Sequence, residues 1–250
     1  MTFARGLMWN PQTKAIQLRK NEIHLWRSNL DRPTETIEKL ALILSTDEQI
    51  RANKFHFSKH RNRFIVARAI LRKILGNYLQ IDPKELLFKY SSRGKPALNN
   101  NESEEQIQFN LSHSEDLALY GFTYNLQIGV DLEYFRPTCD VENIAQRFFS
   151  PREYNIINSI SDQEKQRTFL QIWTAKEAYL KATGEGLGNS LDEIDIDIIK
   201  NEEVKLLSIK GDTQLAARWN LYSFIPESNY LASLVVEANN WELSYYDFEP

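Results

Sequence analysis

The order in which helices and strands are predicted along the chain limits its possible folds more than any other feature. Three strand-like segments, 107–111, 117–124 and 128–134, follow one another with only short loops between them. Consecutive strands joined by such short loops are typical of antiparallel pairing. Helices followed by strands of this kind occur twice, in residues 1–125 and again in residues 126–250. The sequence therefore predicts an α+β protein built from two α+β halves.

Two capping signals mark predicted helix starts. Ser45-Thr46-Asp47-Glu48 and Ser150-Pro151-Arg152-Glu153 both place a glutamate three residues after a serine, as in a capping box. The first predicts a helix to about Phe57, and another helix is predicted from near Lys59 with apolar residues at helical spacing up to Tyr78. The other predicted elements are helices over 141–149 and from about 162 to 184, and strands over 15–18, 23–26, 194–199, 219–225, 231–237 and 241–248.

The composition is that of a folded protein outside the membrane. The chain has 250 residues, 42% of them hydrophobic and 26% charged, which is enough apolar surface to build a core and exclude disorder as the dominant state. Cys139 is the only cysteine, so an intramolecular disulfide and a CxxC site are excluded. The longest uncharged stretch, 117–130, is too short and polar to span a bilayer. The first residues lack a signal-peptide pattern, and we expect a cytoplasmic protein.

Positive charge is concentrated in one segment of an otherwise acidic chain, whose formal net charge is −4. Residues 51–81 contain no Asp or Glu but hold the cations Arg51, Lys54 and Arg63 among others. Such a local excess predicts attraction of an anion rather than a surface for nucleic acid. The alternative interpretation is a solvated face of a helix.

Asp131 and Glu133 lie two residues apart in the segment Gly129-Val130-Asp131-Leu132-Glu133. In a strand, residues i and i+2 point to the same face, so the two carboxylates are predicted to converge. They repel each other unless a cation or a base lies between them, and oxygen ligands suit a hard ion such as Mg²⁺. A strand end at the surface is the alternative interpretation.

A second candidate lies in the segment Trp173-Thr174-Ala175-Lys176-Glu177-Ala178-Tyr179-Leu180-Lys181. Trp173, Glu177 and Lys181 are spaced i, i+4 and i+8, which places them on one face of a helix. A glutamate that completes a metal site, with a lysine beside it for phosphate, fits this spacing. An ordinary Glu–Lys surface pair fits it as well.

Two further segments contain polar side chains that suit a phosphate. In Phe109-Asn110-Leu111-Ser112-His113-Ser114, neighbouring side chains diverge, so Ser112 and His113 do not form a nucleophile and its base. As donors at a strand end they can instead hold a phosphate; a structural histidine is the alternative. Gly94-Lys95-Pro96 predicts a rigid turn presenting one cation, with a purely structural turn as the alternative.

Taken in order, these motifs resemble those of the Sfp-type 4′-phosphopantetheinyl transferases. The order and spacing carry the resemblance more than any single motif does. It covers roughly residues 45 to 200. The matching segments are Gly94–Pro96, Phe109–Ser114, Gly129–Glu133, Phe148–Tyr154 and Trp173–Lys181.

The resemblance implies two similar α+β halves related by a pseudo-twofold axis, with coenzyme A bound in the cleft between them. It implies a Mg²⁺-dependent enzyme of the holo-[acyl-carrier-protein] synthase type, acting as a monomer. Such an enzyme moves the phosphopantetheine arm of coenzyme A to a serine of an apo carrier protein and releases 3′,5′-ADP. The carrier would belong to fatty acid, polyketide or nonribosomal peptide synthesis.

The resemblance also implies roles for individual residues. Asp131, Glu133 and Glu177 would hold Mg²⁺ against the pyrophosphate, Glu177 would accept the serine proton, and Lys181 would pair with the pyrophosphate. These four are the implied catalytic residues. The implied coenzyme A ligands are Arg63, Lys95, Ser112, His113, Asp131, Glu177 and Lys181.

Three other residues are weaker candidates. Glu153 matches a family acid near the site, but it also fits a capping role at Ser150. Arg51 and Lys54 carry suitable charge without a matching motif.

Two hypotheses of other classes compete with the transferase. A non-catalytic module that binds coenzyme A or a carrier protein would keep the fold without turnover; the intact acids at 131, 133 and 177 argue against it. A Mg²⁺-dependent phosphohydrolase would release product without any carrier protein. Nucleic-acid binding has the least support, because the basic segment is short and its apolar residues are needed for the core.

Overall fold

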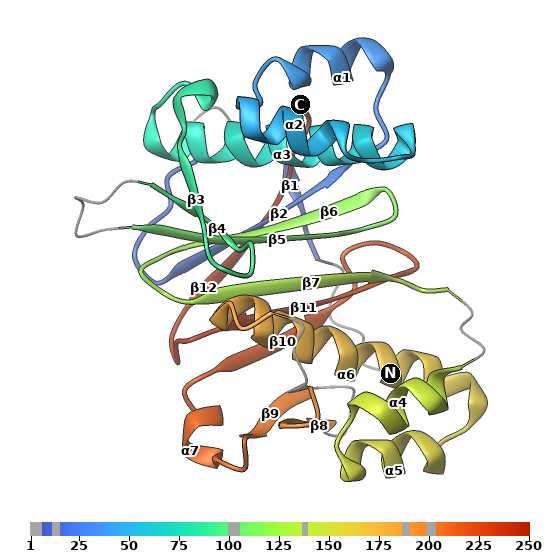
Figure 1. Cartoon of the computed structure of the whole chain (residues 1–250). Helices are drawn as coiled ribbons and strands as arrows, with labels where there is room; N and C mark the ends of the chain where they lie inside the picture. Colours follow the sequence, from blue (N-terminus) through green and yellow to red (C-terminus); the bar gives the residue numbers. More distant parts are fainter. Residues whose placement is uncertain (1–6, 12–15, 100–105, 137–139, 187–190, 199–203) are drawn as a thin grey trace.

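The computed structural model describes residues 7–11, 16–99, 106–136, 140–186, 191–198 and 204–250. Within these ranges the chain forms four layers, in the order helix, sheet, sheet, helix (Figure 1). The outer layers are dominated by two long helices, α3 (Ser58–Leu79) and α6 (Asp162–Thr183). The predicted α+β class is therefore confirmed, with a sheet and a long helix in each half. No helix of the described part is both long and apolar enough to cross a membrane.

The first sheet has five strands in the order β1-β12-β2-β6-β5. Its outer face packs against α3, where Ile70 and Ile74 are buried together with Trp26 and Phe122 of the sheet. Two shorter helices and a small strand pair complete this half. The elements are β1 (Asn10–Pro11), β2 (Glu22–Asn29), α1 (Thr34–Ala41), α2 (Thr46–Asn53), the 3-10 helix Pro83–Glu85, β3 (Phe88–Tyr90), β4 (Pro96–Leu98), β5 (Ile107–Ser114), β6 (Leu117–Tyr124) and β12 (Glu242–Asp247).

The second sheet has three antiparallel strands in the order β10-β11-β7 and is covered by α6. Ala175 and Ala178 of α6 are buried there with Val235 of β11. A second strand pair, β8 with β9, extends this half. The elements are β7 (Ile128–Tyr134), α4 (Val141–Phe148), α5 (Pro151–Ser159), β8 (Ile194–Ile198), β9 (Val204–Ile209), α7 (Thr213–Ala216), β10 (Asn220–Phe224) and β11 (Tyr230–Val236).

A separate apolar core joins the two sheets face to face. Ile23 and Leu25 of β2 and Leu119 of β6 are buried there against Val130 of β7 and Leu234 of β11. Burial of apolar area is the main force that holds such layers together. It fixes β5 and β7, which belong to different sheets, beside each other.

The last strand, β12, belongs to the first sheet although it lies in the second half of the sequence. β12 runs parallel to β2 and β1 in the first sheet, and Arg27 of β2 donates to Asp247 of β12 at 2.6 Å. The chain end thus fastens the two halves together. A division of the chain at residue 125 stays a proposal, and it has to exclude residues 242–247 from the second half.

Most predicted element boundaries are close to the observed ones. Both capping boxes, at Ser45 and Ser150, are present, and Gly184 ends α6 with φ +76°. The first predicted helix was too long, because α2 ends at Asn53 and Phe57 is already the N-cap of α3. Residues 16–18 are not a strand, and Ala15 lies outside the described residues.

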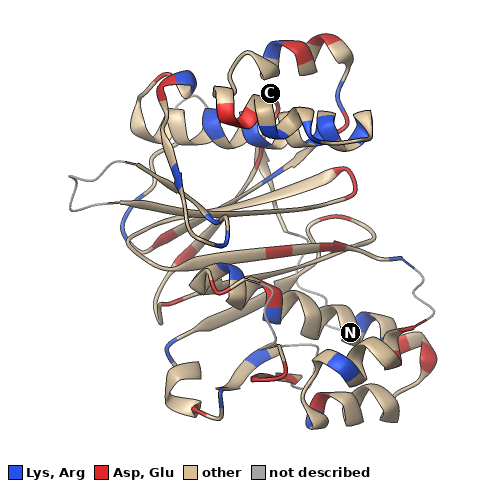
Figure 2. Ribbon diagram, viewed as in Figure 1, with Lys and Arg blue, Asp and Glu red and all other residues tan. Residues whose placement is uncertain are grey.

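Part of the basic segment is used inside the fold, whereas Arg51 and Lys54 are exposed, so attraction of an anion by this segment stays a prediction. Figure 2 shows Lys and Arg along α3. Arg68 and Arg72 are buried, and both bind the buried Glu48 of α2, at 2.8 Å and 2.6 Å from their Nε atoms. Arg72 also donates to the carbonyls of Pro83 and Leu86. These arginines join α2, α3 and the loop that follows.

Gly129 sets the distance between β7 and α6. A Cβ atom at this position would lie only 1.9 Å from the carbonyl oxygen of Ala178. Only glycine allows the strand and the helix to approach so closely. Because the helix is so close, Glu177 and Lys181 of α6 lie next to Asp131 of β7.

Candidate active site

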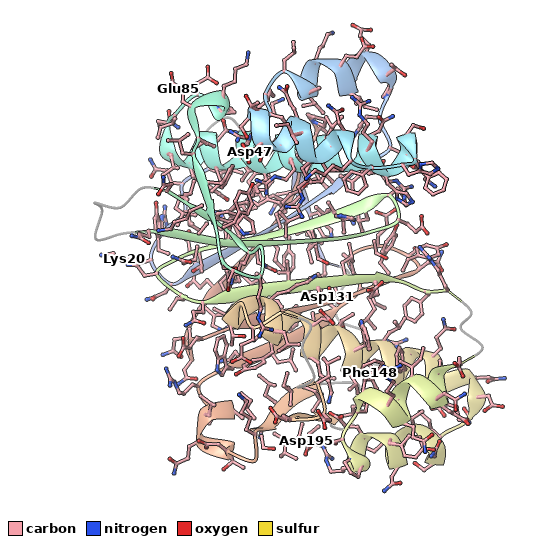
Figure 3. The ribbon with its side chains drawn as sticks, viewed as in Figure 1. Lys20, Asp47, Glu85, Asp131, Phe148 and Asp195 are labelled. Atoms are coloured by element: carbon pink, nitrogen blue, oxygen red, sulfur yellow. The ribbon has the colours of Figure 1, made fainter. Side chains whose placement is uncertain are left out.

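The two acids of β7 share the face of the strand that turns away from the core between the sheets. Val130 and Leu132 are buried in that core, so Asp131 and Glu133, which alternate with them, face the other way. Asp131 is only 3% exposed. Figure 3 shows it between β7 and α6. The predicted alternation along this strand is confirmed.

Polar side chains of β5 hold these acids in place. The Ser112 hydroxyl donates to Asp131 Oδ1 at 3.0 Å, and the Ser114 hydroxyl donates to Glu133 Oε2 at 3.1 Å. Asn110 accepts from the Val130 backbone N–H at 2.9 Å. Sequence reasoning missed Asn110 and Ser114. Their spacing was the available signal, because 110, 112 and 114 share one face of a strand just as 131 and 133 do.

The helix α6 supplies the remaining groups. Lys181 Nζ lies 2.6 Å from Asp131 Oδ1 and 2.8 Å from Ser112 Oγ. Glu177 lies one turn earlier on α6 and is 6% exposed. Two carboxylate oxygens, Asp131 Oδ2 and Glu177 Oε1, are buried without a hydrogen-bond partner. The structure therefore brings together Ser112, Asp131, Glu177 and Lys181, with Glu133 held next to them by Ser114.

The electrostatics of this acidic cluster favour an added cation. Burial, reinforced by Asp131 and Glu133 and opposed by Lys181, raises the pKa of Glu177 to about 7. Burial and the charge of Asp131 also raise the pKa of Glu133. Both raised pKa values mean that the ionised forms are disfavoured, because the negative charges lie close together and away from water.

The donor set fits a hard divalent cation, although the side chains are not arranged as a finished site. Among the residues described by the structure, no group of three or more His, Cys, Asp or Glu side chains could hold a metal ion together. However, the unpartnered oxygens of Asp131 and Glu177 are the kind of ligand that Mg²⁺ takes, usually one or two carboxylates with phosphate oxygens and water. Lys181 at present provides the positive charge.

Arg63, the predicted phosphate ligand on α3, is engaged by carboxylates instead of being free. Its guanidinium donates to Asp31 at 2.7 and 2.8 Å and to Glu115 at 3.0 Å. These hydrogen bonds, with that to Asp31 first, raise the pKa of the arginine. A phosphate at this place would have to share Arg63 with two acids.

Lys95 and His113 border the cluster without contacting its acids. Lys95 donates to the carbonyl of Ala182, next to Lys181, at 2.7 Å, and burial lowers its pKa to about 8. His113 follows Ser112 with its side chain at the surface. Loss of solvation by the surrounding protein lowers the pKa of His113, and the positive charges of Lys181 and Arg63 lower it further.

Glu153 has the capping role that was the alternative for it. One of its oxygens accepts from the Ser150 N–H at 2.8 Å and the other from the Ile196 N–H at 2.7 Å. Lys176 Nζ lies 2.6 Å from the same carboxylate, and both side chains are fully buried. Glu153 therefore joins α5, β8 and α6, and its oxygens are fully occupied there.

Arg51 and Lys54 lie at the end of α2, on the surface. Arg51 lies over the ring of Phe64, 5.6 Å from its centroid. The structure gives neither residue a described contact with the acidic cluster, so both stay weak candidates.

The fold and this cluster define a class: an α+β enzyme whose buried carboxylates and lysine suit a phosphate-transfer reaction assisted by a cation. Residues 127–235 match the family model described as the 4′-phosphopantetheinyl transferase superfamily. Residues 26–121 match the one described as 4′-phosphopantetheinyl transferase, N-terminal.

Two curated relatives agree with these matches. The 4′-phosphopantetheinyl transferase HetI of Nostoc sp. is 45% identical over 96% of this chain and 98% of its own length. The 4′-phosphopantetheinyl transferase Sfp of Bacillus subtilis is 26% identical over 71% of this chain and 77% of its own. A solved holo-[acyl-carrier-protein] synthase from Neisseria meningitidis is 18% identical, with a TM-score of 0.38, over 45% of this chain and 98% of that one. The chain belongs to the 4′-phosphopantetheinyl transferase family.

Proposed function

We propose that this protein transfers the phosphopantetheine arm of coenzyme A to a serine of an apo carrier protein. The serine oxygen forms a bond to the phosphorus next to the pantetheine arm. The bond between that phosphorus and the bridging oxygen breaks, and 3′,5′-ADP leaves. The buried cluster of Asp131, Glu177 and Lys181 carries this proposal, because a pyrophosphate needs its charge neutralised before a hydroxyl can attack.

Each member of the cluster has a proposed task. Asp131 and Glu177, with Glu133 beside them, would hold Mg²⁺, which supplies Lewis-acid stabilisation when bound. Glu177 takes the serine proton, directly or through a water molecule. A carboxylate placed beside the reacting hydroxyl is a suitable general base. Lys181 pairs with the pyrophosphate.

The nucleotide part of coenzyme A would lie along the first half. We assign its phosphates to Arg63, Lys95, Ser112 and His113. Lys95 and Ser112 support this because both contact the segment that carries Lys181. Arg63 would exchange part of its contact with Asp31 and Glu115 for phosphate.

The partner class follows from the reaction. We propose apo acyl carrier protein, or a carrier domain of a fatty acid, polyketide or nonribosomal peptide synthase, as the acceptor. The holo-[acyl-carrier-protein] synthase type, a monomeric state and a cytoplasmic location belong to the same proposal.

The test is the intact mass of an apo carrier protein after incubation with this protein, coenzyme A and Mg²⁺. We expect a gain of one phosphopantetheine group that is abolished by EDTA. Carriers from the three pathways are compared in parallel, and transfer to acyl carrier protein tests the synthase type. If no carrier gains mass while coenzyme A still binds, the protein is a binding module.

A further inference from the structure

Two lysines of α6 each contact a buried carboxylate at 2.6 Å, but their surroundings differ. Lys176 is fully buried, and besides Glu153 it donates to the carbonyls of Leu191 and Ile194 at 2.8 and 2.6 Å. Its three N–H donors are therefore all used. This ion pair is a permanent part of the core.

Lys181 is held much less firmly. Its side chain is 29% exposed, and among the residues that the structure describes its ammonium contacts Asp131 and the Ser112 hydroxyl only. A lysine ammonium is a point charge on a flexible stem, so it can leave one anion for another with little rearrangement.

The carboxylates around Lys181 are also incompletely neutralised. Asp131 Oδ2 and Glu177 Oε1 have no hydrogen-bond partner although both atoms are buried. Asp131, Glu133 and Glu177 all interact electrostatically with Lys181, and Glu133 also interacts with Arg136. A stronger cation placed at the two free oxygens would compete with the ammonium for Asp131.

We infer that Lys181 is an exchangeable counter-ion, which neutralises Asp131 in the metal-free protein and is released toward the substrate when a divalent cation binds to the acids. This inference rests on the proposed function, because the released ammonium is the one assigned to the pyrophosphate. It gives the site a fixed order: the cation binds first, and the lysine then becomes available to the anionic substrate.

The first test measures binding of Mg²⁺ alone by titration calorimetry, without coenzyme A. Lys181→Met removes the competing charge, and we expect it to bind Mg²⁺ at least about tenfold more tightly than the wild-type protein does. Lys39→Met is the matched control, because Lys39 forms a similar 2.6 Å contact, with Glu35, on the exposed surface of α1. Its Mg²⁺ affinity should equal that of the wild type. Equal or weaker affinity in Lys181→Met overturns the inference.

The second test needs no variant, so it holds even if Lys181→Met folds poorly. Lysine acetylation of the wild-type protein is followed residue by residue by mass spectrometry, with EDTA or with saturating Mg²⁺. We expect labelling of Lys181 to become several-fold faster with Mg²⁺, whereas Lys39 does not change. Unchanged labelling of Lys181 overturns the inference. If the wild type still modifies a carrier in that case, the proposed function survives; if no carrier is modified, it fails separately.

Discussion

Two buried charge clusters, one under each long helix, differ in whether their hydrogen bonds are complete. Under α3, Glu48 has both oxygens bound by Arg68 and Arg72, and Arg72 donates to two further carbonyls. Beside α6, Asp131 and Glu177 each leave one buried oxygen without a partner. In the α3 cluster positive charge is in excess, and Arg72 directs part of it to backbone carbonyls. In the α6 cluster negative charge is in excess.

This difference separates stability from function. A completely bonded cluster has nothing left to bind, so it can only hold α2 against α3. An incomplete cluster costs stability in the protein alone, because a buried charge or polar atom without a partner is unfavourable. Such a cost is recovered when a ligand completes the cluster, as is typical of functional sites.

The largest effect should come from removing the proposed base of the incomplete cluster. Glu177→Gln should lower the rate of carrier modification by about 10²- to 10⁴-fold, because an amide accepts no proton and neutralises a cation poorly. Asp131→Ala should lower it similarly and raise the Mg²⁺ concentration needed. Rates come from intact mass of the carrier over time. Circular dichroism checks that both variants fold, and wild-type rates in both would contradict the assignment of the acidic cluster.

Breaking the complete cluster should destabilise the fold instead. Glu48→Gln leaves Arg68 and Arg72 buried without their carboxylate, and we expect about 3–5 kcal/mol less stability. Urea denaturation measures the change. Glu35→Gln is the control, because it breaks the exposed ion pair with Lys39 and should cost under about 1 kcal/mol. Equal losses in the two variants would contradict the structural role of Glu48.

The sequence alone predicted the acidic cluster better than it predicted the basic one. Alternation in a strand and spacing in a helix are local rules, so Asp131 with Glu133, and Glu177 with Lys181, could be assigned to shared faces. The use of Arg68 and Arg72 depends on Glu48, a residue of another helix, and no local pattern shows that contact. The same holds for β12, whose place beside β2 depends on the whole chain.

Glycine and serine illustrate the same limit at the site itself. Gly129 is visible in the sequence motif. However, glycine is needed there because the carbonyl of Ala178 lies against the strand, and that contact exists only once α6 packs on β7. Ser114 and Asn110 lie in the quoted segment, yet their partners on β7 belong to a strand that does not pair with β5 in one sheet.

The pH dependence of stability should also reveal the incomplete cluster. Glu177 has a pKa of about 7 in the folded protein, above the ordinary value, so the folded state is favoured when this group is protonated. Without metal, stability should therefore fall as the pH rises from about 5 through 7, by at most about 3 kcal/mol. Glu177→Gln should remove that fall, and Mg²⁺ should offset it at pH 8.

Denaturation curves with EDTA at pH 5 and pH 8 test this for the wild type and Glu177→Gln. The variant should be the more stable of the two at pH 8 and similar at pH 5. If the stability of the wild type instead rises relative to that of Glu177→Gln as the pH increases, the surroundings stabilise the ionised form of Glu177, and the prediction is wrong.

The smallest expected effect concerns the support of Glu133. Ser114→Ala removes the hydroxyl that donates to Glu133 at 3.1 Å and accepts from the Tyr134 N–H at 3.1 Å. Loss of these hydrogen bonds should cost about 1 kcal/mol of stability. If Glu133 helps to hold the cation, the variant also needs more Mg²⁺ for half-maximal carrier modification, while the rate at saturating Mg²⁺ changes little. Ser159→Ala, which removes a hydroxyl hydrogen bond at the exposed end of α5, is the control and should leave the Mg²⁺ requirement unchanged. A Mg²⁺ requirement that Ser114→Ala also leaves unchanged would restrict the cation site to Asp131 and Glu177, the two acids whose oxygens are left without partners.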